Sequence, residues 1–247
     1  MKSLAAKLAF IQAALLAALL PLAVQASDSG SLMSQAKKYY WGQGAKQDYQ
    51  KALQLYEQAA ENGNPLAQFI AGGMYYTGKG TEVNLQKAFD LLSRAAAQGK
   101  TSPEAQMALG TIYLRGQAVP QNYVKAKESL HQAALAGNAE AQNELGFMYF
   151  VGNGVEKDYD QAMKWFDQAA GQGLSIAQFN VGMMWYLGSS SRGTDLVKAY
   201  AWLALAESGG HPGAAGLLQH IKPMLPPEEL RAAQQLSSEM YEQYHRL

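Results

Sequence analysis

The sequence predicts an all-α protein, a right-handed α-solenoid of about five helix-turn-helix repeats with a C-terminal capping helical segment. Two series of small residues recur at a nearly fixed period. Glycines in one kind of segment are 38, 36 and 36 residues apart, at Gly72, Gly110, Gly146 and Gly182. Alanines in a second kind are 36, 38, 36 and 37 residues apart, at Ala52, Ala88, Ala126, Ala162 and Ala199. Such periods are typical of stacked helical hairpins.

The segment 139–173 shows the repeating unit most completely. Apolar residues recur at helical spacing over 139–149 and over 159–170, and glycines follow each segment. One hairpin of this size cannot bury its apolar surface alone, so the copies must stack. The predicted units are 32–64 (N-terminal, partial), 65–100, 101–138, 139–174 and 175–210, followed by a C-terminal cap at 211–247.

Residues 1–26 are predicted to be a cleavable signal peptide. Lys2 and Lys7 precede an apolar run over 8–24, and small residues stand before a cut near Ser27. An uncleaved membrane anchor is the alternative, because the run approaches the length of a thin span. The chain has no cysteine, and secretion without disulfides favours a Gram-negative periplasm. We therefore expect a periplasmic protein, with an extracellular location as the alternative and no membrane span after signal removal.

The charge balance argues against nucleic acid as a partner. The whole chain has 20 basic and 20 acidic residues, and removing 1–26 takes away two lysines and no acid. The mature chain therefore has 18 basic and 20 acidic residues and a net charge of −2. A nucleic-acid-binding protein needs a basic excess. Nor does this balance point to an anionic membrane surface.

Two faces of the first helix of each repeat are predicted to be structural, because residues three and four apart share a face. One face is always apolar and is expected to pack on the partner helix: Ala67, Ala71, Met74; Ala105, Leu109, Ile112; Ala141, Leu145, Met148; Ala177, Val181, Met184. The other face has glutamine, glycine and an aromatic residue, as in Gln142, Gly146 and Tyr149. Its aromatic rings are expected to pack between repeats, and its glycines to admit a neighbouring backbone or bulky ring.

The second helix of each repeat is equally regular. Short polar residues precede it and are expected to cap its N-terminus: Asp48, Asn84, Asn122, Asp158 and Asp195. Four residues after the periodic alanine, larger residues are expected to fill the space between repeats: Tyr56, Leu92, Leu130, Phe166 and Leu203. Glycines in the left-handed conformation are expected to end the helix: Gly63, Gly99, Gly137, Gly173 and Gly210.

The unit resembles a known repeat. From Ala141 to Gly173 the chain reads Ala-x-x-x-Leu-Gly-x-Met-Tyr-x-x-Gly-x-Gly-Val-x-x-Asp-Tyr-x-x-Ala-x-x-Trp-Phe-x-x-Ala-Ala-x-x-Gly. This pattern is similar to the Sel1-like repeat, a relative of the tetratricopeptide repeat, and the resemblance covers roughly residues 32–210. Local departures are Leu85 and Leu196 in place of tyrosine, Ala118 in place of a hinge glycine, and a lengthened hinge at 188–194. The resemblance implies a role in envelope assembly, signalling or host interaction.

The repeat pattern fades beyond Gly210. Residues 212–221 are predicted to form a shortened first helix, 222–227 to break it, and 228–245 to form a polar amphipathic helix. Solenoids need a terminal cap, and one apolar stripe suits that role: Leu230, Ala233, Leu236, Met240 and Tyr244. A partner-binding helix is the alternative.

The sequence gives little support to catalysis, and we expect no catalytic residue, metal site or cofactor. The histidines are scattered and lack the paired spacing of zinc sites. The segment Ser34-Gln-Ala-Lys37 matches the S-x-x-K motif of penicillin-interacting enzymes, and Lys100-Thr-Ser102 half resembles their K-T-G element. The S-D-N element is missing. An envelope enzyme that acts on peptidoglycan or β-lactams is therefore the alternative function.

A third face of the first helices varies between copies while remaining rich in aromatic residues and methionine. This variation indicates that packing alone does not decide the residue. We expect the face to line a concave groove that binds a peptide or helix of another envelope protein. The alternative is that the adjacent repeat covers it. The candidate partner-binding residues are Phe69, Tyr76, Met107, Leu114, Asn143, Phe147, Phe150, Phe179, Met183 and Tyr186.

The sequence thus predicts a non-enzymatic periplasmic scaffold for another protein. The alternative is a secreted host-interaction factor, which would have the same architecture but would lie outside the cell.

Overall fold

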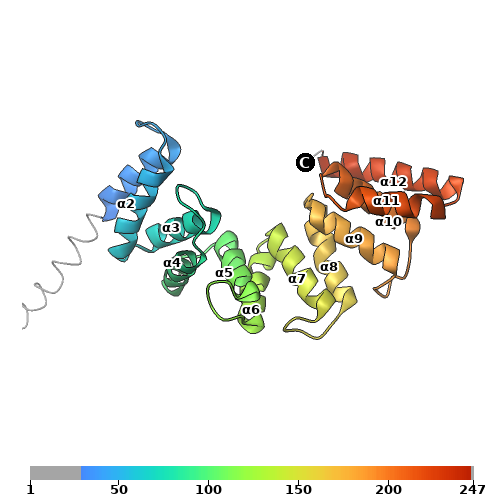
Figure 1. Cartoon of the computed structure of the whole chain (residues 1–247), viewed down its shortest axis with the longest axis horizontal. Helices are drawn as coiled ribbons and strands as arrows, with labels where there is room; N and C mark the ends of the chain where they lie inside the picture. The colour runs from blue at the N-terminus through green and yellow to red at the C-terminus, as the bar shows by residue number, and fades with distance from the viewer. Residues whose placement is uncertain (1–28, 246–247) are drawn as a thin grey trace, which may run out of the picture. The chain divides into compact units, whose positions relative to one another are not determined.

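The computed structural model describes residues 29–245, and this part of the chain consists of helices and loops without strands (Figure 1). The predicted signal peptide, 1–26, lies outside the described residues. The described chain divides into two compact units. The first unit comprises residues 29–101 with 117–119, and the second comprises residues 102–116 with 120–245.

The first unit begins with a helix that covers residues 29–41. It continues with α2 (Tyr49–Glu61), α3 (Pro65–Thr77) and α4 (Leu85–Ala97), each in contact with the next. Buried Tyr56 of α2 and Met74 of α3 belong to one core, together with alanines that keep the helices close. The all-helical prediction for this part of the chain is confirmed.

The second unit repeats the same hairpin three times and then adds a C-terminal segment. Its helices are α5 (Pro103–Arg115), α6 (Tyr123–Leu135), α7 (Ala139–Val151), α8 (Tyr159–Gly171), α9 (Ser175–Leu187), α10 (Leu196–Ser208), α11 (Ala214–Ile221), the 3-10 helix η1 (Lys222–Met224) and α12 (Pro227–His245). Each helix from α5 to α10 has 13 residues, as do α2 to α4. This constant length is the structural counterpart of the sequence period.

The predicted helix caps are confirmed in all five second helices. In each case the side-chain oxygen of the capping residue accepts a hydrogen bond of 2.9–3.0 Å from a backbone N–H in the first turn. Asp158 accepts two such bonds, from Asp160 and Gln161. The glycine predicted to end each second helix has a positive φ, between 73° and 90°. These local signals fix where each second helix begins and ends.

The glycine inside each first helix lies against the second helix of its own hairpin. A β-carbon built on Gly146 would come within 2.7 Å of the Phe166 ring, and one on Gly72 within 2.8 Å of Leu92. The same relation joins Gly110 to Leu130 and Gly182 to Leu203. Leu92, Leu130, Phe166 and Leu203 therefore pack inside their hairpins. Leu130 and Phe166 also share a core cluster with residues of the next first helix, as expected for residues that fill the space between repeats.

The apolar face of a first helix packs against the preceding repeat. Leu145 and Met148 of α7 share a core cluster with Leu130 and Ala134 of α6. In the next repeat, Val181 of α9 belongs to the same cluster as residues of α8. The partner helix of this face is thus the second helix of the preceding repeat. Contacts on both sides of each first helix join successive hairpins of the second unit into one stack.

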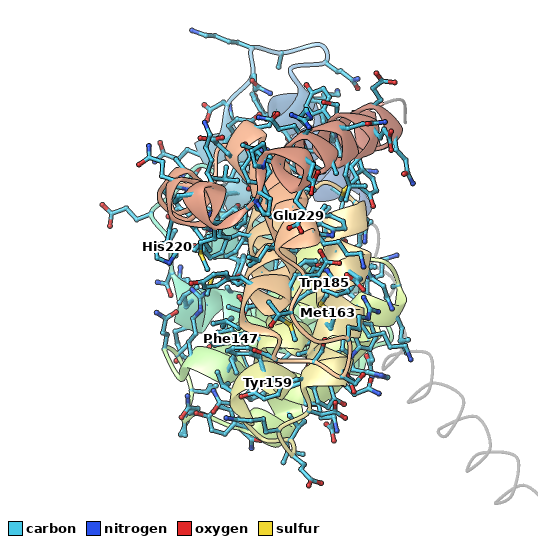
Figure 2. All side chains as sticks on the ribbon, turned by 90° about the vertical axis from the view of Figure 1, so that its right-hand side faces the viewer. Phe147, Tyr159, Met163, Trp185, His220 and Glu229 are labelled. Carbon is cyan, nitrogen blue, oxygen red and sulfur yellow. The ribbon has the colours of Figure 1, made fainter. Side chains whose placement is uncertain are left out.

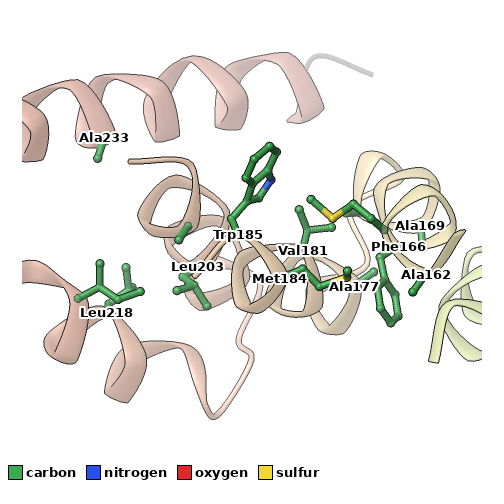
Figure 3. Close-up of a cluster of buried hydrophobic side chains, with 14 of the residues drawn as sticks. Ala162, Phe166, Ala169, Ala177, Val181, Met184, Trp185, Leu203, Leu218 and Ala233 are labelled. Atoms are coloured by element: carbon green, nitrogen blue, oxygen red, sulfur yellow. The ribbon is translucent and has the colours of Figure 1, made fainter. Parts of the chain in front are cut away.

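The largest described core lies at the C-terminal end of the second unit (Figure 3). Phe166 from α8, Met184 and Trp185 from α9, and Leu203 from α10 are buried there. Helix α12 adds Ala233, which is fully buried. The amphipathic helix predicted at 228–245 therefore covers the last repeat.

Contacts along α12 and α11 complete this cap. The rings of Trp202 on α10 and Tyr244 on α12 lie 5.9 Å apart, and Leu230 packs on the same core. Helix α11 corresponds to the predicted shortened first helix, and η1 follows it at the predicted break. Among the described helices, none is long and apolar enough to cross a membrane.

Candidate interaction site

A pocket of about 420 Å³ lies along the first helices of three successive repeats in the second unit. We call it the first-helix pocket. Helices α5, α7 and α9 and the hinge after α7 position its lining side chains. The lining residues are Leu114, Arg115, Asn143, Glu144, Phe147, Asn153, Ile176 and Asn180.

The apolar part of the pocket is exposed to solvent. Phe147, labelled in Figure 2, is 46% exposed, and Ile176 is 45% exposed. The ring of Phe147 lies 6.5 Å from the ring of Phe150, measured between centroids, with the planes tilted by 23°. Leu114 is half-buried and packs against the core of the α6 and α7 region. The pocket therefore offers a bulky apolar surface that the described part of the fold does not cover.

Asparagine amides form the second part of the lining. Asn180 Nδ2 on α9 donates a hydrogen bond of 2.9 Å to Asn143 Oδ1 on α7. Asn143 is buried, whereas Asn180 is half-buried, and Asn153 lies on the hinge that follows α7. A primary amide has both donor and acceptor capacity, as a peptide main chain has. These groups suit a polypeptide ligand.

One ion pair completes the lining. Arg115 Nη2 on α5 lies 3.8 Å from Glu144 Oε1 on α7. Burial raises the pKa of the Glu144 carboxyl above its ordinary value, Arg115 partly offsets this effect, and the neighbouring Glu140 adds to it. The pocket thus holds a half-buried carboxylate whose ionised form is disfavoured by its surroundings.

The structure places three of the ten predicted binding residues in the first-helix pocket: Leu114, Asn143 and Phe147. Two others, Phe179 and Tyr186 on α9, contact the C-terminal segment. The Phe179 ring stacks on His211 with centroids 4.1 Å apart. The Tyr186 hydroxyl lies 3.1 Å from His220 Nε2 on α11. The segment after the last repeat thus covers part of the variable face.

The remaining predicted residues lie elsewhere and are half-buried. Phe150 packs near Tyr159, with ring centroids 5.4 Å apart. Met107 Sδ accepts a hydrogen bond of 3.4 Å from Thr111 Oγ1. Met183 lies on α9, and the last two, Phe69 and Tyr76, belong to α3 of the first unit. The structure therefore does not bring these residues into the pocket.

Sequence reasoning missed five lining residues: Arg115, Glu144, Asn153, Ile176 and Asn180. All but Asn153 occupy the second, sixth or thirteenth position of a first helix. These positions continue the predicted stripe at helical spacing, and they also vary between copies; the sixth is Ile70, Ala108, Glu144 and Asn180. The same signal of variation could have found them. Asn153 lies in a hinge, where helical period gives no direction.

The residues that suggested an enzyme are an S-x-x-K match, half of a K-T-G element and scattered histidines, and the structure gives the surroundings of each. Ser34 and Lys37 are exposed on the helix at 29–41, and Ser102 caps α5 by accepting a hydrogen bond of 3.3 Å from the backbone N–H of Ala105. His131 lies edge-on to the Trp165 ring, at 5.9 Å between centroids. Within residues 29–245, no group of three or more acidic, histidine or cysteine side chains is arranged to hold a metal ion.

Five segments of the chain match the Sel1 repeat family: 36–64, 65–100, 103–138, 139–174 and 175–211. Together they cover well over half of the sequence. The structure is similar to the crystal structure of a Sel1 repeat protein from Oxalobacter formigenes, with 28% sequence identity and a TM-score of 0.65. That similarity covers 88% of this chain and 87% of the other.

Two more distant structures share the fold. YrrB, described as a TPR protein with an unusual peptide-binding site, has 19% identity and a TM-score of 0.53 over 76% of this chain and 90% of its own. MamA protein also has 19% identity, with a TM-score of 0.52 over 77% of this chain and 96% of its own. The matched repeats and the shared helical-hairpin architecture establish that this chain belongs to the Sel1 repeat family.

Proposed function

We propose that this chain is a non-enzymatic scaffold that binds a segment of another protein in the first-helix pocket. The observation that carries the proposal is the exposure of Phe147 beside Ile176 in a pocket of about 420 Å³. Aromatic side chains set in such pockets supply much of the affinity in protein interfaces. The asparagine amides beside them can bond to a peptide main chain.

The repeat itself does not require an aromatic residue at this position. The equivalents of Phe147 in the other first helices are Gly73, Thr111 and Met183. The buried equivalents on the packing faces are conserved in character from copy to copy. The choice of phenylalanine is therefore better explained by a ligand than by folding. YrrB, with the same kind of fold, is described as having a peptide-binding site.

The proposed location is the cell envelope. Support comes from the signal-peptide layout of residues 1–26 and from the lack of cysteine. N-terminal sequencing of the protein recovered from a periplasmic extract tests this part of the proposal. A mature chain that starts near Ser27 is expected. Recovery of an intact N-terminus from the cytoplasm alone would contradict it.

Selection of peptides tests the binding function directly. The chain 27–247 is screened against a displayed library of random peptides, and enriched sequences are synthesised with a fluorescein label. Their dissociation constants are then measured by fluorescence anisotropy with the wild-type protein, Phe147→Ser and Ile176→Ser. Removal of a central anchor is expected to weaken binding by at least about thirtyfold.

The matched control is Val124→Ser. Val124 is 63% exposed on α6, so its loss also removes an exposed apolar side chain, but away from the pocket. Binding by this variant should equal that of the wild type. Failure to enrich any peptide, or equal binding by both pocket variants, would contradict the proposed function.

A further inference from the structure

We infer that the peptide bound in the first-helix pocket carries a lysine or arginine close to a bulky apolar residue, and that Glu144 is the counter-ion of this basic side chain. The inference rests on the proposed function and specifies the chemistry of the partner. It follows from the charges that line the pocket, their distances and their positions relative to Phe147.

The charged groups of the three pocket helices leave an acidic excess. Helix α9 has no charged residue, and Arg115 and Glu144 are the charged lining residues. Glu140 lies one turn before Glu144 on α7 and interacts unfavourably with its ionised form. Two carboxylates thus share a single guanidinium near the pocket. A cation from the partner would complement this arrangement.

Arg115 is a loose partner for Glu144. Their closest nitrogen–oxygen distance, 3.8 Å, is too long for a hydrogen bond. The Arg115 side chain is 55% exposed, whereas the Glu144 side chain is 26% exposed. A single contact of this length to an exposed arginine side chain contributes little. A second cation that approaches from the open side of the pocket would therefore have a carboxylate available to it.

The surroundings of Glu144 point in the same direction. Burial and Glu140 raise the pKa of Glu144, and the opposing effect of Arg115 does not cancel them. An incoming ammonium or guanidinium group would favour the ionised carboxylate and release this penalty. A neutral side chain at the same place would leave the free-energy cost of ionising Glu144 unchanged, and an acidic side chain would increase it. The pocket therefore discriminates by charge.

The distance between Glu144 and Phe147 on α7 determines how far apart the basic and the apolar residue of the peptide should be. Glu144 and Phe147 are three residues apart, so they lie on one face of the helix with β-carbons about 5–6 Å apart. In an extended peptide, residues i and i+2 point to the same side and are about 7 Å apart. A basic residue and a bulky apolar residue separated by one residue would meet Glu144 and Phe147 together.

A charge-matched set of variants and peptides tests the inference. A peptide selected on the wild-type chain is compared with the same peptide in which the basic residue is replaced by glutamine. The glutamine peptide should bind the wild type about tenfold more weakly. With Glu144→Gln the two peptides should bind alike. Glu128→Gln, which removes an exposed carboxylate on α6, should retain the full preference.

The outcomes separate the two proposals. Loss of binding in Phe147→Ser with an unchanged basic preference in Glu144→Gln would overturn the charge inference alone. Selected peptides without a basic residue would do the same. Equal binding by Phe147→Ser and the wild type would instead overturn the proposed function. A reversed preference for an acidic peptide in Glu144→Lys would support the assignment of Glu144, provided that this variant melts like the wild type.

Discussion

Asn180 on α9 donates its side-chain N–H to Asn143 on α7 across 37 residues of sequence, at 2.9 Å. The bond joins the first helices of two successive repeats beside the pocket. Because Asn143 is buried, its amide depends on this contact for part of its hydrogen bonding. The pocket wall is therefore held in place by a polar contact as well as by the apolar core.

Asn180→Ala should lower the free energy of unfolding by about 1–3 kcal/mol, because it removes a donor from a buried acceptor. Urea unfolding of the single variants and of Asn143→Ala/Asn180→Ala measures the coupling. The double variant should lose less than the sum of the two single losses. Gln132→Ala, at an exposed position on α6, provides the control. Strict additivity would show that the two amides do not support each other.

Adjacent glycines in α3 should respond in opposite directions. A β-carbon on Gly72 would lie 2.8 Å from Leu92 Cγ and 3.2 Å from its backbone nitrogen, whereas one on Gly73 would meet nothing within 4 Å. Gly73→Ala should therefore stabilise the protein by up to about 1 kcal/mol through helix propensity. Gly72→Ala should cost about 1–3 kcal/mol through overpacking. Thermal melting of both variants checks the contrast, and equal shifts would refute the packing argument.

Two phenylalanines of the same hairpin should differ in their contribution to stability. Phe166 is buried against Gly146, whereas Phe147 is 46% exposed. Phe166→Ala should lower the free energy of unfolding by about 3–5 kcal/mol. Phe147→Ser should change it by less than about 1 kcal/mol, because nearly half of the Phe147 surface remains exposed to solvent in the folded chain. A large loss in Phe147→Ser would indicate that this ring serves the fold.

Protonation of Glu144 should affect stability in a defined direction. Its pKa is raised in the folded state, so the unfolded chain releases this proton first as the pH rises. The folded state binds more protons between the ordinary and the raised pKa, and stability therefore falls with rising pH through that window. Glu144→Gln has no carboxyl group at this position, so its free energy of unfolding does not fall in this way. The difference in free energy of unfolding between Glu144→Gln and the wild type should be largest above the raised pKa and should shrink below the ordinary glutamate pKa.

Chemical denaturation at a series of pH values measures this difference. Glu128→Gln gives the baseline for loss of one surface carboxylate. A stability difference between the wild type and Glu144→Gln that stays constant across the acid range would contradict the direction assigned to the Glu144 pKa.

The helices themselves could be predicted from the sequence because their signals are local. A capping side chain such as Asp158 bonds within its own first turn, and a glycine such as Gly173 ends a helix through its own backbone conformation. Helical period likewise assigns residues to faces without knowledge of any neighbour. The fivefold recurrence of these signals determined the all-α repeat architecture, and the apolar stripe over 228–245 indicated the terminal helix.

Which neighbour each face meets was decided by the tertiary structure. Phe166 was expected between repeats; it belongs to the core that α8 shares with α9 and also lies on Gly146 within its own hairpin. Phe179 of the variable face is covered by His211. Ile176 and Asn180 on α9 line one pocket with Phe147 on α7, a relation between two helices that the pattern within either helix does not define. The helical period gives the direction in which a side chain points around the axis of its helix. Only the packing of α5, α7 and α9 determines which of those directions remain open to solvent.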